Sequence, residues 1–144
     1  LKVVAELSKR IAKTTSGYTL QMDTPSSIAA YYMEQLRHAK EEYLICAFFD
    51  TKCNFLGDVN ISKGSVNFAY VSPRDIFRHA FDYKAVLFVM LHNHPSGDPN
   101  PSDDDFRITY RIEKGAQLLE LQLADHIIIG DNTYYSFKEN GKLI

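Results

Sequence analysis

The pattern with the clearest chemical meaning in this 144-residue chain is a pair of histidines followed by an aspartate, His92-x-His94-x10-Asp105. Two imidazoles and one carboxylate can bind a single metal ion and leave one of its coordination positions open. A zinc site with three protein ligands and an open position is typical of catalytic centres, whereas structural zinc sites are usually closed by four protein ligands. The spacing therefore predicts a catalytic metal site at His92, His94 and Asp105.

The residues around this pattern predict how the three side chains come together. The apolar run 85–91 suits a strand buried on both faces, and His92 and His94 at its end lie two residues apart, so both imidazoles can turn toward one ion. Residues 95–101 are rich in proline and are expected to form an irregular loop. Ser102 is expected to cap a helix that follows. The inward face of that helix would carry Asp105, Thr109, Ile112, Ala116 and Leu119, with Asp103 and Asp104 turned toward water.

Each part of the pattern also has a purely structural interpretation. Ser102-x-x-Asp105 resembles a capping box, and acidic residues in a first helical turn stabilise the helix dipole. A His-x-His pair at the end of a strand can be simple polar termination. The coincidence of both histidines, a turn and an inward carboxylate favours the metal site. A capping role for Ser102 is compatible with a catalytic one.

The segment 92–105, with the sequence HNHPSGDPNPSDDD, resembles the JAMM motif of the RadC family, bacterial relatives of the JAB/MPN metalloprotease domains. Three further segments match that family in order and spacing, at residues 73–80, 125–130 and 136–141. The resemblance runs from about Ser27 to Ile144 and more weakly back to Leu1. It implies a cytidine-deaminase-like JAB/MPN fold and zinc-dependent hydrolysis of an amide bond in a peptide or isopeptide.

The resemblance also implies a role for each residue of the site. His92, His94 and Asp105 would bind Zn²⁺, and a water would take the fourth position. Ser102 would donate a hydrogen bond to the oxyanion that develops on the substrate. An upstream glutamate would accept a proton from the water and deliver it to the leaving amine.

That glutamate is expected to be Glu42. It begins the apolar segment 42–50, where partial loss of hydration would suit a carboxylate to proton transfer. The adjacent Glu41 is one residue off, so its side chain would point to the opposite face of the strand. From the residues alone, either glutamate could be an ordinary solvated charge, and the resemblance favours Glu42.

The order of helices and strands predicts an α/β domain with three α/β/α layers and a mixed sheet. Residues 1–24 are expected to form an N-terminal helix and linker, and residues 25–144 a RadC-like JAMM/MPN domain. The expected helices cover about 24–40, 73–82 and 102–121, and the expected strands about 43–50, 55–62, 66–71, 85–91, 123–129 and 133–137.

Composition limits the partners and the compartment. The formal net charge is −2 and no basic stripe stands out, so this domain is not expected to bind nucleic acid directly. Two cysteines, Cys46 and Cys53, are too few for a disulfide scaffold and fit a reducing cytoplasm. No apolar run approaches 18 residues, so no membrane span is expected. The expected partner is a protein or peptide substrate, and the oligomeric state stays open. Because the chain starts at Leu1, it is expected to be part of a longer protein.

Two other function classes remain open at this point. One is a metal-dependent nuclease or phosphoesterase linked to DNA repair, although residues 92–105 contain no basic side chain for a phosphate. The other is a non-catalytic interaction module that keeps its metal for stability. It would need neither Glu42 nor Ser102.

Five residues outside the motif are further candidates for a role. His38 and His79 are expected to be surface or packing histidines. Asp125-His126 would either orient a ligand imidazole or make a local hydrogen bond. Arg74 matches the family, but no mechanism follows from it.

Overall fold

The computed structural model describes residues 24–64 and 71–144 of the chain. The helices are α2 (Pro25–Leu36), α3 (Pro73–Asp82) and α4 (Asp103–Leu118), and the strands are β1 (Glu42–Phe49), β2 (Phe55–Gly64), β3 (Leu87–Asn93), β4 (Gln122–Ile129) and β5 (Tyr134–Ser136). The N-terminal helix expected before residue 24 lies outside the described residues, as does nearly all of the strand expected at 66–71. Val71, the described end of that segment, is not in a strand.

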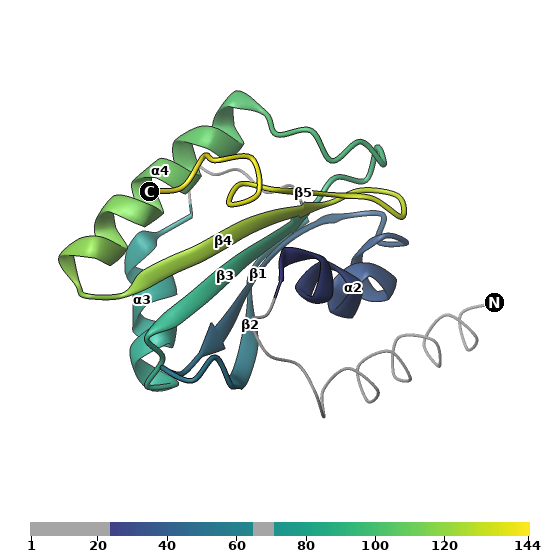
Figure 1. Ribbon diagram of the computed structural model, residues 1–144. Coiled ribbons are helices and arrows are strands. Elements are labelled where there is room, and N and C mark those ends of the chain that lie inside the picture. The colour runs from purple at the N-terminus through teal and green to yellow at the C-terminus, as the bar shows by residue number, and fades with distance from the viewer. Residues whose placement is uncertain (1–23, 65–70) are drawn as a thin grey trace.

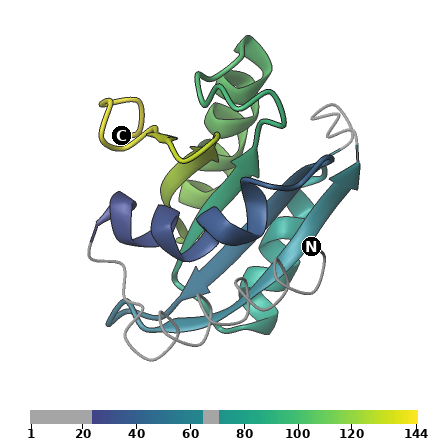
Figure 2. The ribbon, with the colours of Figure 1, turned by 90° about the vertical axis from the view of Figure 1, so that its right-hand side faces the viewer.

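The five strands form one mixed sheet in the spatial order β2-β1-β3-β4-β5. The pair β3 and β4 is parallel, and the other neighbouring pairs are antiparallel. Helix α2 covers one face of the sheet, and α3 and α4 cover the other (Figures 1 and 2). The expected three-layer α/β/α fold is therefore confirmed. No described helix combines the length and apolar character needed to cross a membrane.

Two helices end earlier than expected. Helix α2 stops at Leu36 rather than near residue 40, because the exposed His38 and Lys40 cannot extend its buried stripe. Helix α4 stops at Leu118 rather than near residue 121. Glu120 adopts a positive φ of 57°, and the backbone N–H of residue 121 bonds back to Ala116, as in a helix C-terminal motif. Leu119 was expected on the inward face of this helix, which is wrong: it is 43% exposed.

Side chains alternate between the two faces along the central strands. Leu44, Cys46 and Met90 belong to the core that packs against α3 and α4, whereas Ile45 and Leu91 belong to the core under α2. His92 follows Met90 by two residues and therefore faces α4. The inward stripe of α4 begins with Asp105 and continues through buried Thr109, Ile112 and Ala116, as expected. The sheet and α4 thus bring His92 and Asp105 together.

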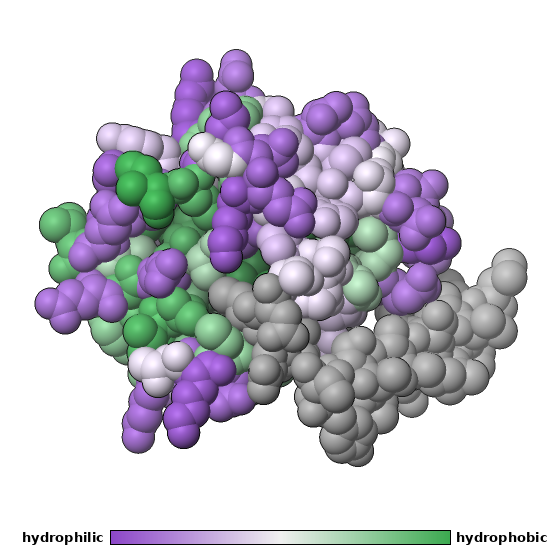
Figure 3. Space-filling view, in the orientation of Figure 1, coloured by the Kyte–Doolittle hydropathy of each residue, from purple (hydrophilic) through white to green (hydrophobic). Residues whose placement is uncertain are grey.

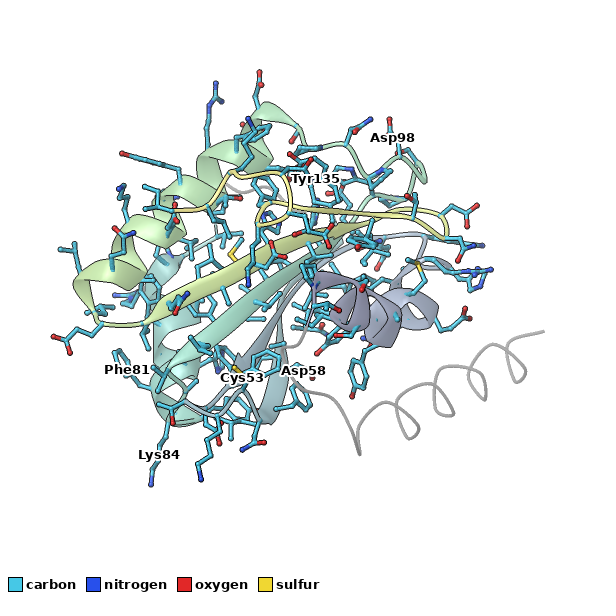
Figure 4. The ribbon with its side chains drawn as sticks, viewed as in Figure 1. Cys53, Asp58, Phe81, Lys84, Asp98 and Tyr135 are labelled. Atoms are coloured by element: carbon cyan, nitrogen blue, oxygen red, sulfur yellow. The ribbon has the colours of Figure 1, made fainter. Side chains whose placement is uncertain are left out.

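The two ends of the sheet differ in polarity. Exposed apolar side chains occur at the ends of α3 and α4, among them Phe81 and Leu118. Figure 3 shows apolar surface gathered over this side of the molecule, and Figure 4 places Phe81 and Lys84 there. Asp98 lies far from them, in the loop that follows β3 (Figure 4). The polar end, where β3 finishes and α4 begins, holds the candidate site.

Candidate metal centre

The three predicted ligands converge on one point. His92 lies at the end of β3, His94 follows it, and Asp105 lies in the first turn of α4. His92 Nε2 is 3.7 Å from Asp105 Oδ1, and His94 Nε2 is 3.2 Å from Asp105 Oδ2. The three ligand atoms lie within 4.8 Å of one another, so the cluster could hold a metal ion. His94 keeps 16% of its side chain exposed, against 3% for His92 and 1% for Asp105, so the cluster reaches the surface beside His94.

Backbone carbonyls orient both imidazoles. His92 Nδ1 lies 3.1 Å from the carbonyl oxygen of Tyr43, and His94 Nδ1 lies 2.8 Å from that of Asp98. A carbonyl oxygen only accepts, so each Nδ1 carries the hydrogen. When a ring is neutral, its lone pair is then on Nε2, which faces Asp105. Without a metal, a protonated His94 donates a hydrogen bond from Nε2 to the Asp105 carboxylate. Nε2, rather than Nδ1, is therefore the atom that each histidine offers to a metal.

Asp105 is held at the start of α4 by a capping box. The backbone N–H of Ser102 donates to Asp105 Oδ2 over 2.8 Å, and the N–H of Asp105 donates to Ser102 Oγ over 3.1 Å. The predicted helix cap at Ser102 is confirmed. Asp105 Oδ1 is buried, and no hydrogen-bond partner for it occurs among the described residues.

The distances to Asp105 are compatible with a bound metal ion such as zinc. Two ligand atoms bound to one tetrahedral zinc lie roughly 3.3 Å apart, given metal–ligand bonds of about 2.0–2.2 Å. The two separations to Asp105, 3.2 and 3.7 Å, are close to that value. Asp105 Oδ1 is buried with no described hydrogen-bond partner and lies 3.7 Å from His92 Nε2, which is a costly arrangement unless a cation satisfies it.

The charges of the cluster also suit a metal. Burial would raise the pKa of Asp105, but hydrogen bonds from His94 and from the Ser102 backbone, with the nearby His92, lower it to about 2. Burial lowers the pKa of His92. The hydrogen bond to Asp105 raises the pKa of His94. An ionised carboxylate and a neutral, buried His92 are the states in which these groups bind metals.

The loop that carries His94 is fastened to the turn after β4. The N–H of His94 donates to the carbonyl of Ile129, and the N–H of Asp131 donates to the carbonyl of Gly97, each over 2.9 Å. A Cβ atom on Gly130 would lie 2.3 Å from the Gly97 oxygen. Only glycine permits this approach, so Gly130 helps to keep His94 in place.

Comparison with known proteins agrees with this geometry. A family model described as RadC-like JAB domain matches residues 22–142. The chain belongs to the RadC-like JAB domain family. Membership of a JAB domain family suggests metal-dependent hydrolase chemistry. The cluster of His92, His94 and Asp105 could hold the metal ion that this chemistry requires.

Curated relatives of this RadC-like domain carry the name UPF0758 protein. The protein from Alkaliphilus metalliredigens is 41% identical over 96% of the chain, and the one from Bacillus velezensis is 38% identical over 96%. The protein from Desulfitobacterium hafniense is 39% identical over 99%. The chain spans 60%, 60% and 63% of the length of these three relatives. The activity and partners of the whole proteins are therefore matters for proposal.

In the RadC-like domain, Glu42 lies beside the cluster. It is the first residue of β1, is partly buried, and shares its strand face with Leu44, which pairs with His92. Its charge acts on both His92 and His94. Glu41 is exposed. The structure therefore brings Glu42 together with the three predicted ligands.

Of the two roles that the sequence left open for the Asp125-His126 pair, the structure shows the local hydrogen bond and no contact of Asp125 with a predicted ligand imidazole among the described residues. Asp125 accepts hydrogen bonds from the backbone N–H of His126 and Lys138 and from the Ser136 hydroxyl, so its role is local. His126 Nδ1 lies 2.6 Å from Thr109 Oγ1, and the Thr109 hydroxyl donates to the carbonyl of Asp105, also over 2.6 Å. His126 therefore supports the helical turn that carries Asp105.

The remaining candidates from the sequence, His38, His79 and Arg74, lie outside this cluster. His38 contacts Arg37 and Glu34 at the surface, and Arg74 is exposed. His79 is partly buried in the last turn of α3.

Three supports of the site were not expected from the sequence. They are the side-chain amide of Asn93, which bonds to the backbone of Glu41 and Tyr43 on either side of Glu42, and the carbonyls of Tyr43 and Asp98. Every residue has a carbonyl, so no sequence signal marks the two that orient a histidine. Asn93 lies between the two histidines of the motif, and this position is a sequence signal that could have marked it as a candidate.

Proposed function

We propose that this RadC-like domain hydrolyses amide bonds in peptides or isopeptides, with Zn²⁺ bound by Nε2 of His92, Nε2 of His94 and the Asp105 carboxylate. The main support is the convergence of His92 Nε2 and His94 Nε2 on the buried Asp105 carboxylate, with a second carboxylate, Glu42, beside them. A site that held metal only for stability would not need that second carboxylate. Zinc in this place would lower the pKa of a bound water to about 7.

Glu42 would manage the proton in this reaction. Its carboxylate would take the proton that the attacking water loses and return it to the nitrogen that leaves when the amide bond breaks. The partly buried position at the start of β1 keeps Glu42 close to both imidazoles without including it in the ligand cluster. We therefore assign it to proton transfer and not to metal binding.

Ser102 would stabilise the substrate oxygen. Its Oγ accepts the N–H of Asp105, which uses an oxygen lone pair and leaves the hydroxyl hydrogen available. That hydrogen would be donated to the carbonyl oxygen of the substrate as negative charge develops there. Capping α4 and assisting catalysis are compatible roles for this hydroxyl.

A comparison of two neighbouring glutamates tests the proposal. The zinc-loaded protein would be incubated with a mixed peptide library, and cleavage would be read by mass spectrometry with and without a chelator. Glu42→Gln should bind zinc normally and lose cleavage, by roughly 100-fold or more. The matched control Glu41→Gln, in the adjacent exposed residue, should behave as the wild type. Chelator-sensitive cleavage that survives in Glu42→Gln would overturn the assigned role.

The nuclease alternative is tested with the same samples. A domain of net charge −2 is expected to bind duplex DNA weakly at physiological salt, because phosphate contacts by Lys and Arg supply most non-specific affinity. A gel shift at micromolar protein, with zinc-dependent DNA cleavage and no peptide cleavage, would replace the proposed function by the nuclease. Zinc binding with no turnover of either polymer would favour the interaction module.

A further inference from the structure

Strand β1 extends beyond the strand that carries the ligands. The ladder between β1 and β3 ends at the pair Leu44 and His92. Glu42 and Tyr43 remain paired with β2 on their other side, through Gly64 and Lys63. The backbone of His94 has by then turned to β4, where its N–H donates to Ile129. On the β3 side, the backbone around Glu42 is therefore held by something other than the ladder.

The side chain of Asn93 continues the ladder for one more step. Its Oδ1 accepts the N–H of Tyr43 over 2.7 Å, and its Nδ2 donates to the carbonyl of Glu41 over 2.9 Å. These two backbone groups flank Glu42 on either side. Asn93 is 1% exposed, so water hardly competes for either bond. One amide group thus replaces the missing peptide group of the neighbouring strand.

We infer that Asn93 is a positioning residue, which fixes the backbone of Glu42 relative to the two histidines through this pair of hydrogen bonds. The inference rests on the proposed function in assigning proton transfer to Glu42. Asn93 lies between His92 and His94 in the chain, so the same three residues that supply two ligands also set the place of the carboxylate. A shift of about 1 Å at a catalytic group can reduce a rate on the order of 100-fold.

The chemistry of the amide explains why asparagine fits here. The site needs one acceptor for the Tyr43 N–H and one donor for the Glu41 carbonyl, at the reach of a short side chain. Aspartate would place a carboxylate oxygen, which cannot donate, against the Glu41 carbonyl oxygen. Alanine would leave both partly buried backbone groups without this partner.

The test compares Asn93→Ala with Asn60→Ala, which changes an exposed asparagine on β2. Asn93→Thr is a second variant, because a β-branched residue suits the strand and a single hydroxyl cannot bridge both backbone groups. Zinc affinity, thermal stability, the kinetics on the peptide cleaved fastest from the library, and amide hydrogen exchange of Tyr43 and Ile45 would be measured. Ile45 lies in the intact part of the ladder, opposite Leu91, and serves as the internal control.

The expected result separates positioning from folding. In both Asn93 variants the Tyr43 amide should exchange at least about tenfold faster, while the Ile45 amide keeps its protection. Zinc affinity should stay within about threefold, and kcat should fall on the order of 100-fold with KM nearly unchanged. Asn60→Ala should match the wild type in every measurement.

Three outcomes would overturn the inference. They are an unchanged Tyr43 exchange rate, a full kcat despite faster exchange, and a loss of zinc that accounts for the whole loss of rate. Failure of the proposed function would look different, because the wild-type protein itself would cleave no peptide. The exchange of Tyr43 would then still decide whether Asn93 holds the backbone around Glu42.

Discussion

Asp105 and Asp125 are both buried carboxylates, and their hydrogen bonds differ in kind. Asp125 Oδ1 accepts the N–H groups of His126 and Lys138, and its Oδ2 accepts the Ser136 hydroxyl. Asp105 Oδ2 accepts the N–H of Ser102, while its Oδ1 is buried with no described hydrogen-bond partner. Both oxygens of Asp125 therefore accept hydrogen bonds from the protein, whereas Asp105 has one oxygen that could bind an added group such as a metal ion.

The pKa values of the two carboxyl groups also differ, because that of Asp125 is raised and that of Asp105 is lowered. Burial raises the pKa of Asp125 despite its hydrogen bonds. Burial also acts on Asp105, but His94 and the Ser102 backbone outweigh it and lower the pKa to about 2. Burial alone therefore does not distinguish the proposed ligand from a structural carboxylate. The distinguishing features are a buried oxygen with no described hydrogen-bond partner and two imidazole Nε2 atoms that face the carboxylate.

The largest effect is expected from Asp105→Ala. Removing a ligand should weaken zinc binding by more than about 100-fold, beyond the usual cost of losing a supporting hydrogen bond. Competition against a chromophoric chelator measures the affinity, and Asp104→Ala, one residue away and exposed, is the control. If Asp105→Ala bound zinc with wild-type affinity, Asp105 would not be a ligand and would not differ from Asp125 in this respect.

Ser102 is hydrogen-bonded to Asp105 and Ser136 to Asp125, so alanine variants of the two serines further test the difference between the two carboxylates. Ser102→Ala should keep zinc and raise the activation free energy of peptide cleavage by roughly 2.7–4 kcal/mol, seen mainly in kcat. Its lost helix cap should cost about 1 kcal/mol of stability. Ser136→Ala removes the hydroxyl that serves Asp125 and should lower stability without changing kcat. If the Ser102→Ala rate recovers once the folded fractions are equalised, Ser102 acts only as a cap.

Asp125→Ala should act on stability alone. It leaves two backbone N–H groups and the Ser136 hydroxyl without their acceptor, which should lower the free energy of unfolding by roughly 2–3 kcal/mol. Urea denaturation in a chelator measures this loss, and zinc per folded chain should stay at the wild-type value. Loss of zinc from the folded fraction would show that Asp125 also supports the ligands.

The smallest expected effect is on the pH dependence of stability, which should change in opposite directions in the Asp105 and Asp125 variants. The lowered pKa of Asp105 gives stability that is present above its ordinary value of 3.8 and is lost as the pH falls toward about 2. The raised pKa of Asp125 gives stability that is present below 3.8 and is lost as the pH rises through the folded value. In metal-free protein, the destabilisation by Asp105→Asn should therefore shrink at low pH, and that by Asp125→Asn should grow. The same trend in both variants would contradict these shifts.

Much of the site could be predicted because its parts are local in sequence. The strand end, the loop and the helix start that carry His92, His94 and Asp105 lie within fourteen consecutive residues, 92–105. Each part has its own local signal, namely an apolar run, prolines and a capping residue. Glu42 lies fifty residues before His92, and only the family resemblance selected it over Glu41.

The parts that could not be predicted depend on tertiary contacts. The early end of α4 follows from a chain reversal at Glu120 that no glycine marks. The contact between Asn93 and the backbone around Glu42 requires knowing that β1 lies beside β3. The link from His126 to Asp105 passes through Thr109 and requires knowing which side chains meet where α4 packs against β4.

The most direct test of the metal centre is X-ray absorption at the zinc edge, on protein loaded with one equivalent of zinc. The account predicts one zinc per chain with only nitrogen and oxygen neighbours at about 2.0–2.2 Å, two of them imidazoles, and no zinc in the His92→Ala/Asp105→Ala double variant. A sulfur neighbour at about 2.3 Å, an absence of imidazole scattering, or full zinc occupancy in the double variant would contradict it.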